Sequence, residues 1–197
     1  MLVVPLYEAA KYLPALVQIL AQGGVIAYPT DTLYGFGCDI FSKSGIERIW
    51  QLKGRSARKP ISMVCADLNQ VREYAVVDEY ASRLMKQVLP GPFTVVLPAT
   101  PKAPPSVCSE KGKVGIRVPK CQMALDLVVN LGHPISSTSV NKTGQPALTN
   151  PSEIAEIFPQ LDAIIDAGEL TGPGSTVINV TGEEVNVIRE GVGELHF

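Results

Sequence analysis

The sequence predicts a single α/β domain built on a twisted, mixed β-sheet that is flanked by helices. Short apolar runs typical of buried strands alternate with segments of helical periodicity, and a tight turn joins the last two runs. The 197 residues, 46% of them hydrophobic, are enough to bury one substantial core. Only 18% are charged, and 17 glycines and 16 prolines indicate many shaped turns rather than a helical bundle. We therefore expect one domain that spans residues 1–197.

The first third of the chain predicts two helices with a strand between them. Apolar residues at helical spacing within residues 8–22 predict an amphipathic helix that ends at the following Gly-Gly pair, where a left-handed cap is sterically free. The apolar run 25–28 predicts a buried strand. Ser44 and Glu47 have the spacing of a capping box, so we expect a second helix to begin there and to end at Gly54.

The remaining elements alternate in the same way and close with a hairpin. The stretch from Pro98 to Gly112 holds four prolines and little that could pack, so we expect an exposed loop that serves as a flap. The expected strands are 61–66, 93–97, 114–118, one near Ile135, one near 164–165, 177–180 and 185–188, and the expected helices are 78–89, 123–131 and 152–158.

The overall charge excludes a protein that attracts polyanions with its whole surface. The net charge is −2, so binding of phosphate or RNA needs a local cluster of cations. The four cysteines lie far apart without a CxxC pair, which indicates free thiols in a reducing cytoplasm rather than disulfides or a zinc knuckle. No apolar run approaches the roughly 18 residues that span a bilayer. We expect a cytoplasmic protein without a membrane segment.

Several common catalytic and nucleotide-binding signatures are absent from the sequence. There is no P-loop of the form GxxxxGK[ST], no GxGxxG fingerprint and no GxSxG elbow. Two histidines, one of them next to the C-terminus, are a poor supply for a zinc site or a Ser-His-Asp triad. The chemistry is therefore expected to depend on cations and hydroxyl groups, and we assign no metal ligands.

The segment PTDTLYGFG, residues 29–37, directly follows a predicted strand. Ligands commonly bind where the strands of an open α/β sheet end. Two threonine hydroxyls, a phenol and two glycines are suited to line a small polar pocket. The same residues are typical of a glycine turn in which Thr and Asp bond to their own backbone. By itself the segment favours neither interpretation.

The segment KGRSARKP, residues 53–60, is dense in cations although the chain is otherwise poor in charge. Cations near a helix C-terminus gain about 0.3–1 kcal/mol from the helix dipole, so a structural role is open. Like charges held close together are costly unless an anion lies between them, and both Arg and Lys bind phosphate. We favour an anion-binding role for this basic segment.

Two further segments carry hydroxyl groups, and two single arginines lie near them in the predicted sheet. Within the segment 136–144, residues 136–143 supply five hydroxyls and an amide. These groups suit recognition of a nucleotide or amino acid but also fit a polar loop. The segment GPGSTV, residues 172–177, enters the final hairpin, whose second strand carries Arg189. Arg117 ends a strand of its own. None of these features is decisive alone.

Taken in order, these clusters resemble the motifs of the YrdC/YciO family. PTDTLYGFG resembles the opening motif of the family, KGRSARKP its Lys-x-Arg segment and LPGPFT its Pro-Gly-Pro-x-Thr turn. IRVP, STSVN, GSTVI and REG resemble the remaining landmarks. Each motif is weak, but seven in register across residues 24–193 make chance an implausible explanation.

The resemblance implies a YrdC-like fold with a concave, positively lined cavity that binds ATP, L-threonine and bicarbonate. The implied activity is threonylcarbamoyl-AMP synthase, a nucleotidyltransferase of tRNA modification, in a short form without a C-terminal extension. Threonine would be held by Thr32, Tyr34, Arg117, Ser137 and Ser175. ATP would be held by Arg55, Lys59, Ser139, Asn141 and Arg189, and Lys53 and Arg55 would be catalytic by screening the repulsion between a carbamate and the phosphates.

The same resemblance implies a cofactor and a partner. Mg²⁺ would accompany ATP, with Asp31 as only a weak ligand candidate. The proline-rich stretch would act as a lid that keeps water from a labile product. A downstream threonylcarbamoyl transferase would receive this product, and weak RNA binding is a further expectation.

Departures from the family pattern keep two alternatives open. Val64 stands where family members often have a histidine, and Val140 where alanine is common. STSV and REGVG are also similar to the YciO branch, whereas the retained Lys-x-Arg and Ser-x-Asn pairs favour the synthase. One alternative is a YciO-like protein that acts on another nucleotide or a carbamoylated compound, or that binds a nucleotide or RNA, without synthase activity. The other is an RNA-binding module, for which 6% aromatic residues supply a poor stacking platform.

Overall fold

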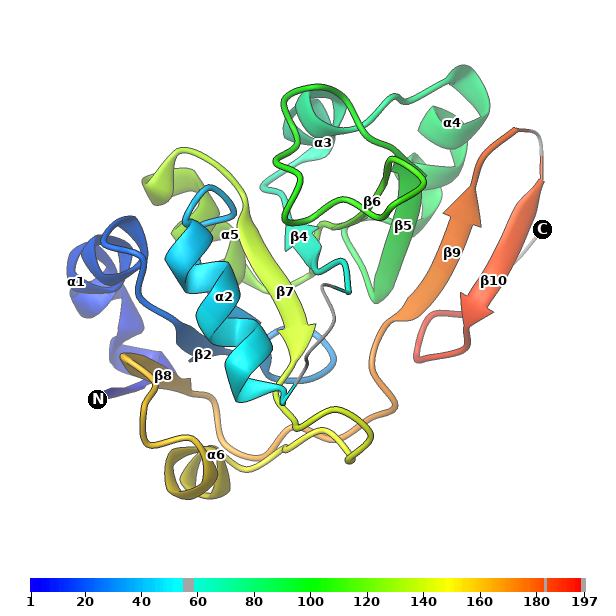
Figure 1. The fold of residues 1–197 in the computed structure, drawn as a ribbon. Coiled ribbons are helices and arrows are strands. Elements are labelled where there is room, and N and C mark those ends of the chain that lie inside the picture. Colours follow the sequence, from blue (N-terminus) through cyan, green and yellow to red (C-terminus); the bar gives the residue numbers. More distant parts are fainter. Residues whose placement is uncertain (55–58, 183, 196–197) are drawn as a thin grey trace.

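The computed structural model describes residues 1–54, 59–182 and 184–195 of the chain. Within these residues, ten strands form one sheet in the order β1-β8-β2-β3-β7-β4-β6-β5-β9-β10 (Figure 1). Parallel pairs such as β4–β6 and antiparallel pairs such as β4–β7 both occur, so the sheet is mixed, as predicted. The strands are β1 Leu2–Pro5, β2 Ile26–Tyr28, β3 Gly35–Gly37, β4 Ser62–Val64, β5 Phe93–Pro98, β6 Lys113–Arg117, β7 Ile135–Ser139, β8 Ala163–Asp166, β9 Thr176–Val180 and β10 Val185–Arg189.

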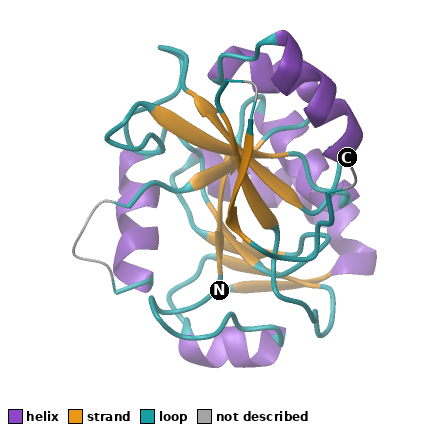
Figure 2. Ribbon diagram, turned by 90° about the vertical axis from the view of Figure 1, so that its right-hand side faces the viewer, coloured by secondary structure: helices purple, strands orange, loops and turns teal. Residues whose placement is uncertain are grey.

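Helices lie on both sides of the strands (Figure 2). Two of them, α1 (Ala9–Ala21) and α5 (Gln122–Leu131), pack against each other, and α1 also contacts β1 and β8. The helices of the described residues are the short 3₁₀ helix Leu6–Glu8, α1 Ala9–Ala21, α2 Lys43–Leu52, α3 Leu68–Tyr74, α4 Glu79–Val88, α5 Gln122–Leu131 and α6 Pro151–Ile157.

The structure confirms the type of every predicted helix and strand, with ends that shift by a few residues. The expected capping box is wrong: the Ser42 side chain caps α2 by accepting a hydrogen bond from the Gly45 amide at 3.0 Å. Four elements were not predicted, namely β1, the 3₁₀ helix, β3 and α3. They are short, and β3 reads Gly-Phe-Gly, so apolar periodicity gives almost no signal for it.

Alternation along the strands divides the core into two clusters, one on each face of the sheet. On β2, Ala27 belongs to one cluster, whereas Ile26 and Tyr28 belong to the other. On β8, Ile164 and Ile165 separate in the same way. Because both faces are covered, these central strands are apolar throughout, which is why the sequence shows them as short continuous runs.

The proline-rich stretch 99–112 is not the unpacked loop that the sequence predicts. Val107 is fully buried and Ala103 is 7% exposed, and both belong to the core. Isolated bridges join Ala99 to Ala75 and Cys108 to Val114. The prediction was wrong because it gave the four prolines more weight than Val107 and Ala103, two apolar residues that pack into the core.

None of the described helices has the length and apolar character needed to cross a membrane.

We expect Phe158→Ala to destabilise the fold strongly. Phe158 is 1% exposed, and its ring meets that of Phe36 edge to face at 5.1 Å, beside the strand β3 that borders the pocket described below. Removing a buried aromatic ring leaves a cavity and costs about 3–5 kcal/mol. Urea unfolding measures this loss. Tyr7→Ala, at a side chain 85% exposed, is the control and should change the free energy of unfolding by less than about 0.5 kcal/mol.

Candidate functional site

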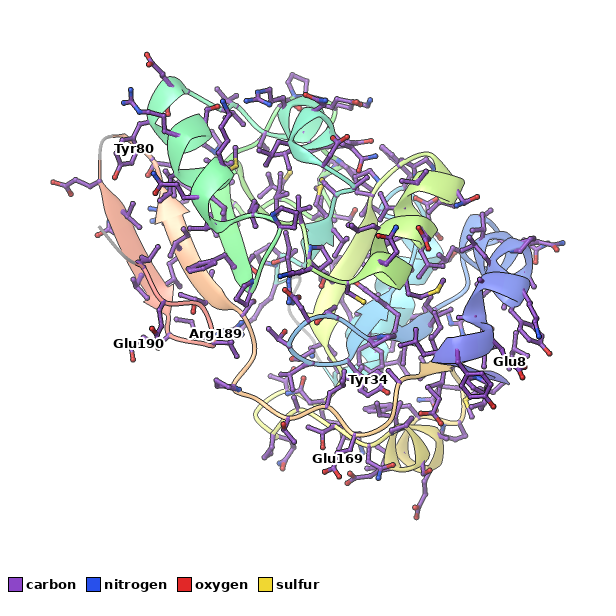
Figure 3. The ribbon with its side chains drawn as sticks, turned by 180° about the vertical axis from the view of Figure 1, so that it is seen from behind. Glu8, Tyr34, Tyr80, Glu169, Arg189 and Glu190 are labelled. Carbon is purple, nitrogen blue, oxygen red and sulfur yellow. The ribbon has the colours of Figure 1, made fainter. Side chains whose placement is uncertain are left out.

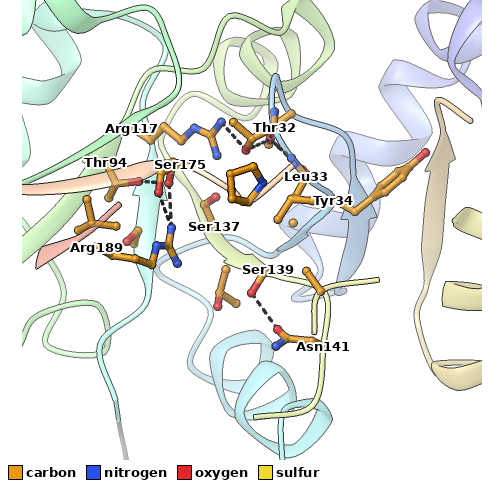
Figure 4. A pocket seen from close by; sticks show the side chains of 18 of the residues that line it. Thr32, Leu33, Tyr34, Thr94, Arg117, Ser137, Ser139, Asn141, Ser175 and Arg189 are labelled. Carbon is orange, nitrogen blue, oxygen red and sulfur yellow. Dashed lines mark hydrogen bonds between the residues drawn. The ribbon is translucent and has the colours of Figure 1, made fainter. Parts of the chain in front are cut away.

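A pocket of about 340 Å³ lies over the middle of the sheet (Figure 4). Segments from β3, β4, β5, β6, β7, β9 and β10 border it, so residues far apart in the sequence meet there. Hydroxyl groups and two guanidinium groups dominate its polar lining. The lining includes the polar side chains of Thr30, Thr32, Tyr34, Ser62, Thr94, Arg117, Ser137, Ser139, Asn141, Ser175 and Arg189.

The pocket exists because neighbouring strands place small residues on the same face of the sheet. The strand register sets Gly35 opposite Ser139 and Ser62 opposite Ser137. Gly115 belongs to the same face, where an added Cβ would lie 2.6 Å from the Ser62 hydroxyl. Side chains this small leave a hollow that larger ones would fill. The residues between them point to the opposite face and are buried there: Phe36, Met63, Ile116 and Ser136.

Arg117 is anchored at one end of the pocket. It is 6% exposed, and its guanidinium donates hydrogen bonds to the Asp31 carboxylate and, at 2.9 Å, to the Thr32 hydroxyl. Asp31 also accepts a bond from the Lys120 amide at 3.1 Å. Nε of Arg117 has no hydrogen-bond partner among the described residues. The guanidinium is thus fixed in position and keeps unused donor capacity.

Arg189 reaches the pocket from β10, on the other side from Tyr34 (Figure 3). Its Nη2 donates to the Ser175 carbonyl at 2.7 Å and to the Ser175 hydroxyl at 3.2 Å, and that hydroxyl lies 2.9 Å from Thr94 Oγ1. Burial lowers the pKa of Arg189, and the positive charge of Arg117 lowers it further. Two guanidiniums that repel each other across a shared hollow are stabilised when an anion binds between them.

Lys53 does not line the pocket, contrary to its predicted role of screening phosphates. It is 2% exposed, and its ammonium donates to the Ser139 carbonyl at 2.6 Å and to Oδ1 of Asn141 at 2.7 Å. The ammonium also lies 5.7 Å from the centre of the Phe36 ring. The strand end and the following turn wrap around the charge, so Lys53 positions the residues of the pocket from behind.

The hydroxyl-rich segment 136–144 is strand and turn rather than the polar loop that was the simpler interpretation. Ser139 ends β7 and donates a hydrogen bond at 2.8 Å to Asn141 (Figure 4). The amide nitrogen of Asn141 donates to the Gln145 carbonyl at 2.6 Å. Val140 is fully buried in the core on the far side. A side chain bulkier than alanine at this position therefore does not narrow the pocket.

The phenol of Tyr34 is directed away from the pocket (Figure 4). Its hydroxyl donates to the Gly168 carbonyl at 2.7 Å and accepts a bond from the Ala167 amide at 2.8 Å. Burial raises the pKa of Tyr34. Tyr34 therefore borders the pocket without offering its hydroxyl to a ligand, which differs from the predicted contact to threonine.

Val64, which stands where family members often have a histidine, lies beside Arg117 in the sheet register and packs in the core.

The pocket gathers most of the predicted site residues but not the basic segment as a whole. Lys59 is exposed and lines a neighbouring groove, and Arg55 lies outside the described residues. Thr30, Ser62 and Thr94 line the pocket and were not predicted as site residues, although the LPGPFT motif contained a signal for Thr94. The predicted residues that the pocket brings together are Thr32, Tyr34, Arg117, Ser137, Ser139, Asn141, Ser175 and Arg189.

The described residues contain no group of three His, Cys, Asp or Glu side chains that could hold a metal ion. Asp31, the weak Mg²⁺ candidate, is already engaged by Arg117 and the Lys120 amide. Any Mg²⁺ at this pocket would be held chiefly by the phosphates of a bound nucleotide.

Comparison with known proteins places this pocket in a family context. A family model for Sua5, YciO and YrdC proteins, described as "Telomere recombination", matches residues 18–191. The protein named YciO in Escherichia coli is 38% identical to this chain, and the match covers 91% of this chain and 88% of YciO. The crystal structure of E. coli YciO superposes with a TM-score of 0.91 at 35% identity, over 98% of this chain and 96% of YciO.

Proteins named for a synthase activity are similar to nearly the same extent. The threonylcarbamoyl-AMP synthase of Nitrosococcus oceani is 36% identical over 85% of this chain and 93% of its own. The structure of Pyrococcus abyssi Sua5 complexed with L-threonine has a TM-score of 0.89 at 31% identity, and covers 97% of this chain and 58% of its own.

We expect Lys53→Met to lower stability as well as any activity of the pocket. The change leaves the Ser139 carbonyl and the Asn141 amide oxygen without their charged donor, and each hydrogen bond to a charged group contributes about 1.5–3 kcal/mol. Thermal and urea unfolding measure the loss. Lys59→Met, at an exposed lysine, is the matched control and should unfold like the wild type. An unchanged stability of Lys53→Met would contradict the positioning role.

Proposed function

The chain belongs to the Sua5/YciO/YrdC family, and we propose that it is the enzyme that makes threonylcarbamoyl-AMP from L-threonine, bicarbonate or CO2, and ATP, for tRNA modification. In this reaction it acts as a nucleotidyltransferase and releases pyrophosphate. The observation that carries the proposal is the pair of guanidiniums, Arg117 and Arg189, fixed at two sides of one hydroxyl-lined pocket. Such a pocket suits a reaction between two anions.

L-threonine binds at the Arg117 end of the pocket. The guanidinium attracts the carboxylate, and Asp31 and Thr32 hold it in place. The hydroxyls of Ser137 and Ser175 supply partners for the threonine side chain. A pocket that pairs a substrate hydroxyl rejects analogues that lack it, because its own buried groups are then left unpaired. The threonine bound to P. abyssi Sua5 supports this substrate.

ATP binds across the opposite part of the pocket, between Ser139, Asn141 and Arg189. Lys53 holds Ser139 and Asn141 from behind, so their orientation does not depend on the ligand. Lys59 lines the neighbouring groove, and we assign it to the phosphates of ATP together with Arg55, as the family motif implies. Mg²⁺ enters with ATP and offsets part of the phosphate charge.

The reaction joins the two substrates through a carbamate. The threonine amine forms an N–C bond with CO2 and loses a proton, and a carbamate oxygen then attacks the α-phosphorus of ATP. As the new P–O bond forms, the bond to the bridging oxygen breaks and pyrophosphate leaves with the electron pair. Arg117 and Arg189 offset the repulsion between the two anions and the charge that develops on the phosphoryl oxygens. A downstream threonylcarbamoyl transferase then consumes the labile product.

A second candidate is a YciO-like protein that acts on or binds another nucleotide or RNA without this activity. One observation favours it: the identity to E. coli YciO is 38%, slightly above the 36% to the N. oceani synthase. The two candidates differ in whether release of pyrophosphate requires threonine.

A turnover assay separates them. The protein is mixed with ATP, Mg²⁺, bicarbonate and single amino acids, and mass spectrometry follows an aminoacyl carbamate joined to AMP. We expect this product with threonine, and several-fold less with serine or valine, because each lacks one of the groups that the pocket pairs or contacts. Pyrophosphate release that ignores threonine, or salt-sensitive RNA binding without ATP turnover, would favour the second candidate.

Arg117→Lys tests the threonine end of the pocket. Lysine keeps the charge but loses the planar fork that binds a carboxylate through two bonds. We expect KM for threonine to rise about tenfold, equivalent to about 1.4 kcal/mol, while KM for ATP changes less than about twofold. Arg83→Lys, in an exposed pair with Glu79 on α4, is the control. An equal rise in both KM values for Arg117→Lys would argue against a separate threonine end.

A further inference from the structure

The residues that follow β10 fold back onto the start of β9 (Figure 1). We call residues 190–195 the strap. The Val192 amide donates a hydrogen bond to the Gly174 carbonyl at 2.8 Å, and Leu195 packs against the core. The strap therefore contacts the segment that brings Ser175 into the pocket. The function proposed above assigns nothing to it.

Thr176 binds the strap from the side of β9 that faces away from the pocket. Side chains alternate along an extended chain, so Ser175 and Val177 line the pocket and Thr176 does not. Thr176 is 3% exposed. Its hydroxyl donates to the Gly193 carbonyl at 2.7 Å and accepts from the Gly191 amide at 3.1 Å. This hydroxyl thus joins the start of β9 to two points of the strap.

Two glycines allow the strap to lie directly against its neighbours. An added Cβ at Gly191 would lie 2.4 Å from the carbonyl carbon of Ser175 and 2.5 Å from the carbonyl oxygen of Gly174. An added Cβ at Gly193 would lie 2.5 Å from the ring of Phe93. Neither Gly191 nor Gly193 has a positive φ. Close approach, rather than backbone conformation, is therefore what requires glycine at both positions.

The chain that leads into β9 has little rigidity of its own. Gly172 and Gly174 both have a positive φ, of 149° and 88°. Glycine loses more conformational freedom on folding than any other residue, so such a segment needs contacts elsewhere to fix one conformation. The strap supplies these contacts to Gly174 and, through Thr176, to the first residue of β9.

Ser175, which lies between these two contacts, orients groups on the pocket side. Its carbonyl accepts a hydrogen bond from Nη2 of Arg189 at 2.7 Å, and its hydroxyl accepts from the same nitrogen at 3.2 Å. The hydroxyl also lies 2.9 Å from Oγ1 of Thr94. A shift of the Ser175 backbone would therefore move a cation and a hydroxyl of the pocket together.

We propose that Thr176 is a positioning residue of the site. By binding the strap, its hydroxyl holds Ser175 in place, and through Ser175 it holds Arg189. The inference rests on the proposed function, in which Ser175 pairs with threonine and Arg189 with ATP. Thr176 itself touches neither substrate. Displacements of about 1 Å caused by a residue away from the reacting atoms can lower activity about a hundredfold, so a change at Thr176 should reach the pocket.

Calorimetric titration of Thr176→Val with ATP and Mg²⁺, and separately with L-threonine, tests the proposal without requiring turnover. Valine has nearly the same shape but leaves the Gly191 amide and the Gly193 carbonyl without their partner. We expect both Kd values to rise about tenfold, equivalent to about 1.4 kcal/mol. Hydrogen exchange in residues 190–195, followed by mass spectrometry, should be faster than in the wild type, because the strap opens more often.

Three further variants make the result specific. Thr176→Ser keeps the hydroxyl and should return both Kd values to within about twofold of the wild type. Gly191→Ala keeps the Thr176 hydroxyl but sets a methyl group against the Ser175 backbone, so it should weaken both ligands several-fold. Thr171→Val, at an exposed threonine outside the pocket lining, makes the same chemical change and should bind both ligands like the wild type.

Two results would overturn the positioning role. One is a lower melting temperature or faster exchange of the strap in Thr176→Val with unchanged Kd values, because Thr176 would then stabilise the fold without orienting the pocket. The other is equal weakening by Thr171→Val, because the loss would not depend on the strap.

The outcomes also distinguish this inference from the proposed function. Formation of threonylcarbamoyl-AMP by the wild type, with unchanged Kd values in Thr176→Val, would overturn the positioning role and leave the synthase in place. ATP binding that Thr176→Val and Gly191→Ala weaken and Thr176→Ser retains, in a protein that makes no threonine-dependent product, would support the positioning of Arg189 and overturn the synthase.

Discussion

Small side chains on one face of the central strands are the constraint on which the rest of this structure depends. β3, β7 and β4 present Gly35, Ser139 and Ser62 toward the same hollow, and Gly115 of β6 lies next to Ser62 on the same face, while the residues between them fill the core behind. Strand alternation makes the two faces independent, so a dense core and an open pocket share the same strands. A site built on a sheet in this way is held more rigidly than one built on loops.

The cations of the protein differ in role according to what surrounds them. Lys53 is buried among oxygen acceptors of its own chain and stabilises the turn that carries Asn141. Arg117 is oriented by Asp31 yet keeps donor capacity, and Arg189 is desolvated and repelled by Arg117. Lys113 donates hydrogen bonds to the neutral side chains of Asn179 and Thr181. The surroundings of each cation decide whether it stabilises the fold or is available to a ligand. A count of positive charges in the sequence does not distinguish these surroundings.

The family resemblance and the pocket geometry support the same chemistry from different directions. The motifs identified the residues, and the sheet register explains why residues about 150 positions apart, such as Thr32 and Arg189, border one cavity. Tyr34 shows the limit of a motif, because it lies within PTDTLYGFG but its hydroxyl bonds to the segment 167–168 instead of facing the pocket. Membership of a motif establishes position along the chain, whereas direction depends on neighbouring elements.

The sequence by itself determined the mixed α/β class, the type of nearly every element and the segments that supply the site, because apolar periodicity and turn residues are local properties of the chain. It did not determine that Lys53 is buried, that Ser139 belongs to a strand, or that Val107 anchors the proline-rich stretch. Those facts depend on contacts between residues distant in sequence. Only the tertiary structure decided them, because burial and side-chain direction are set by the strand register and by what packs on each face.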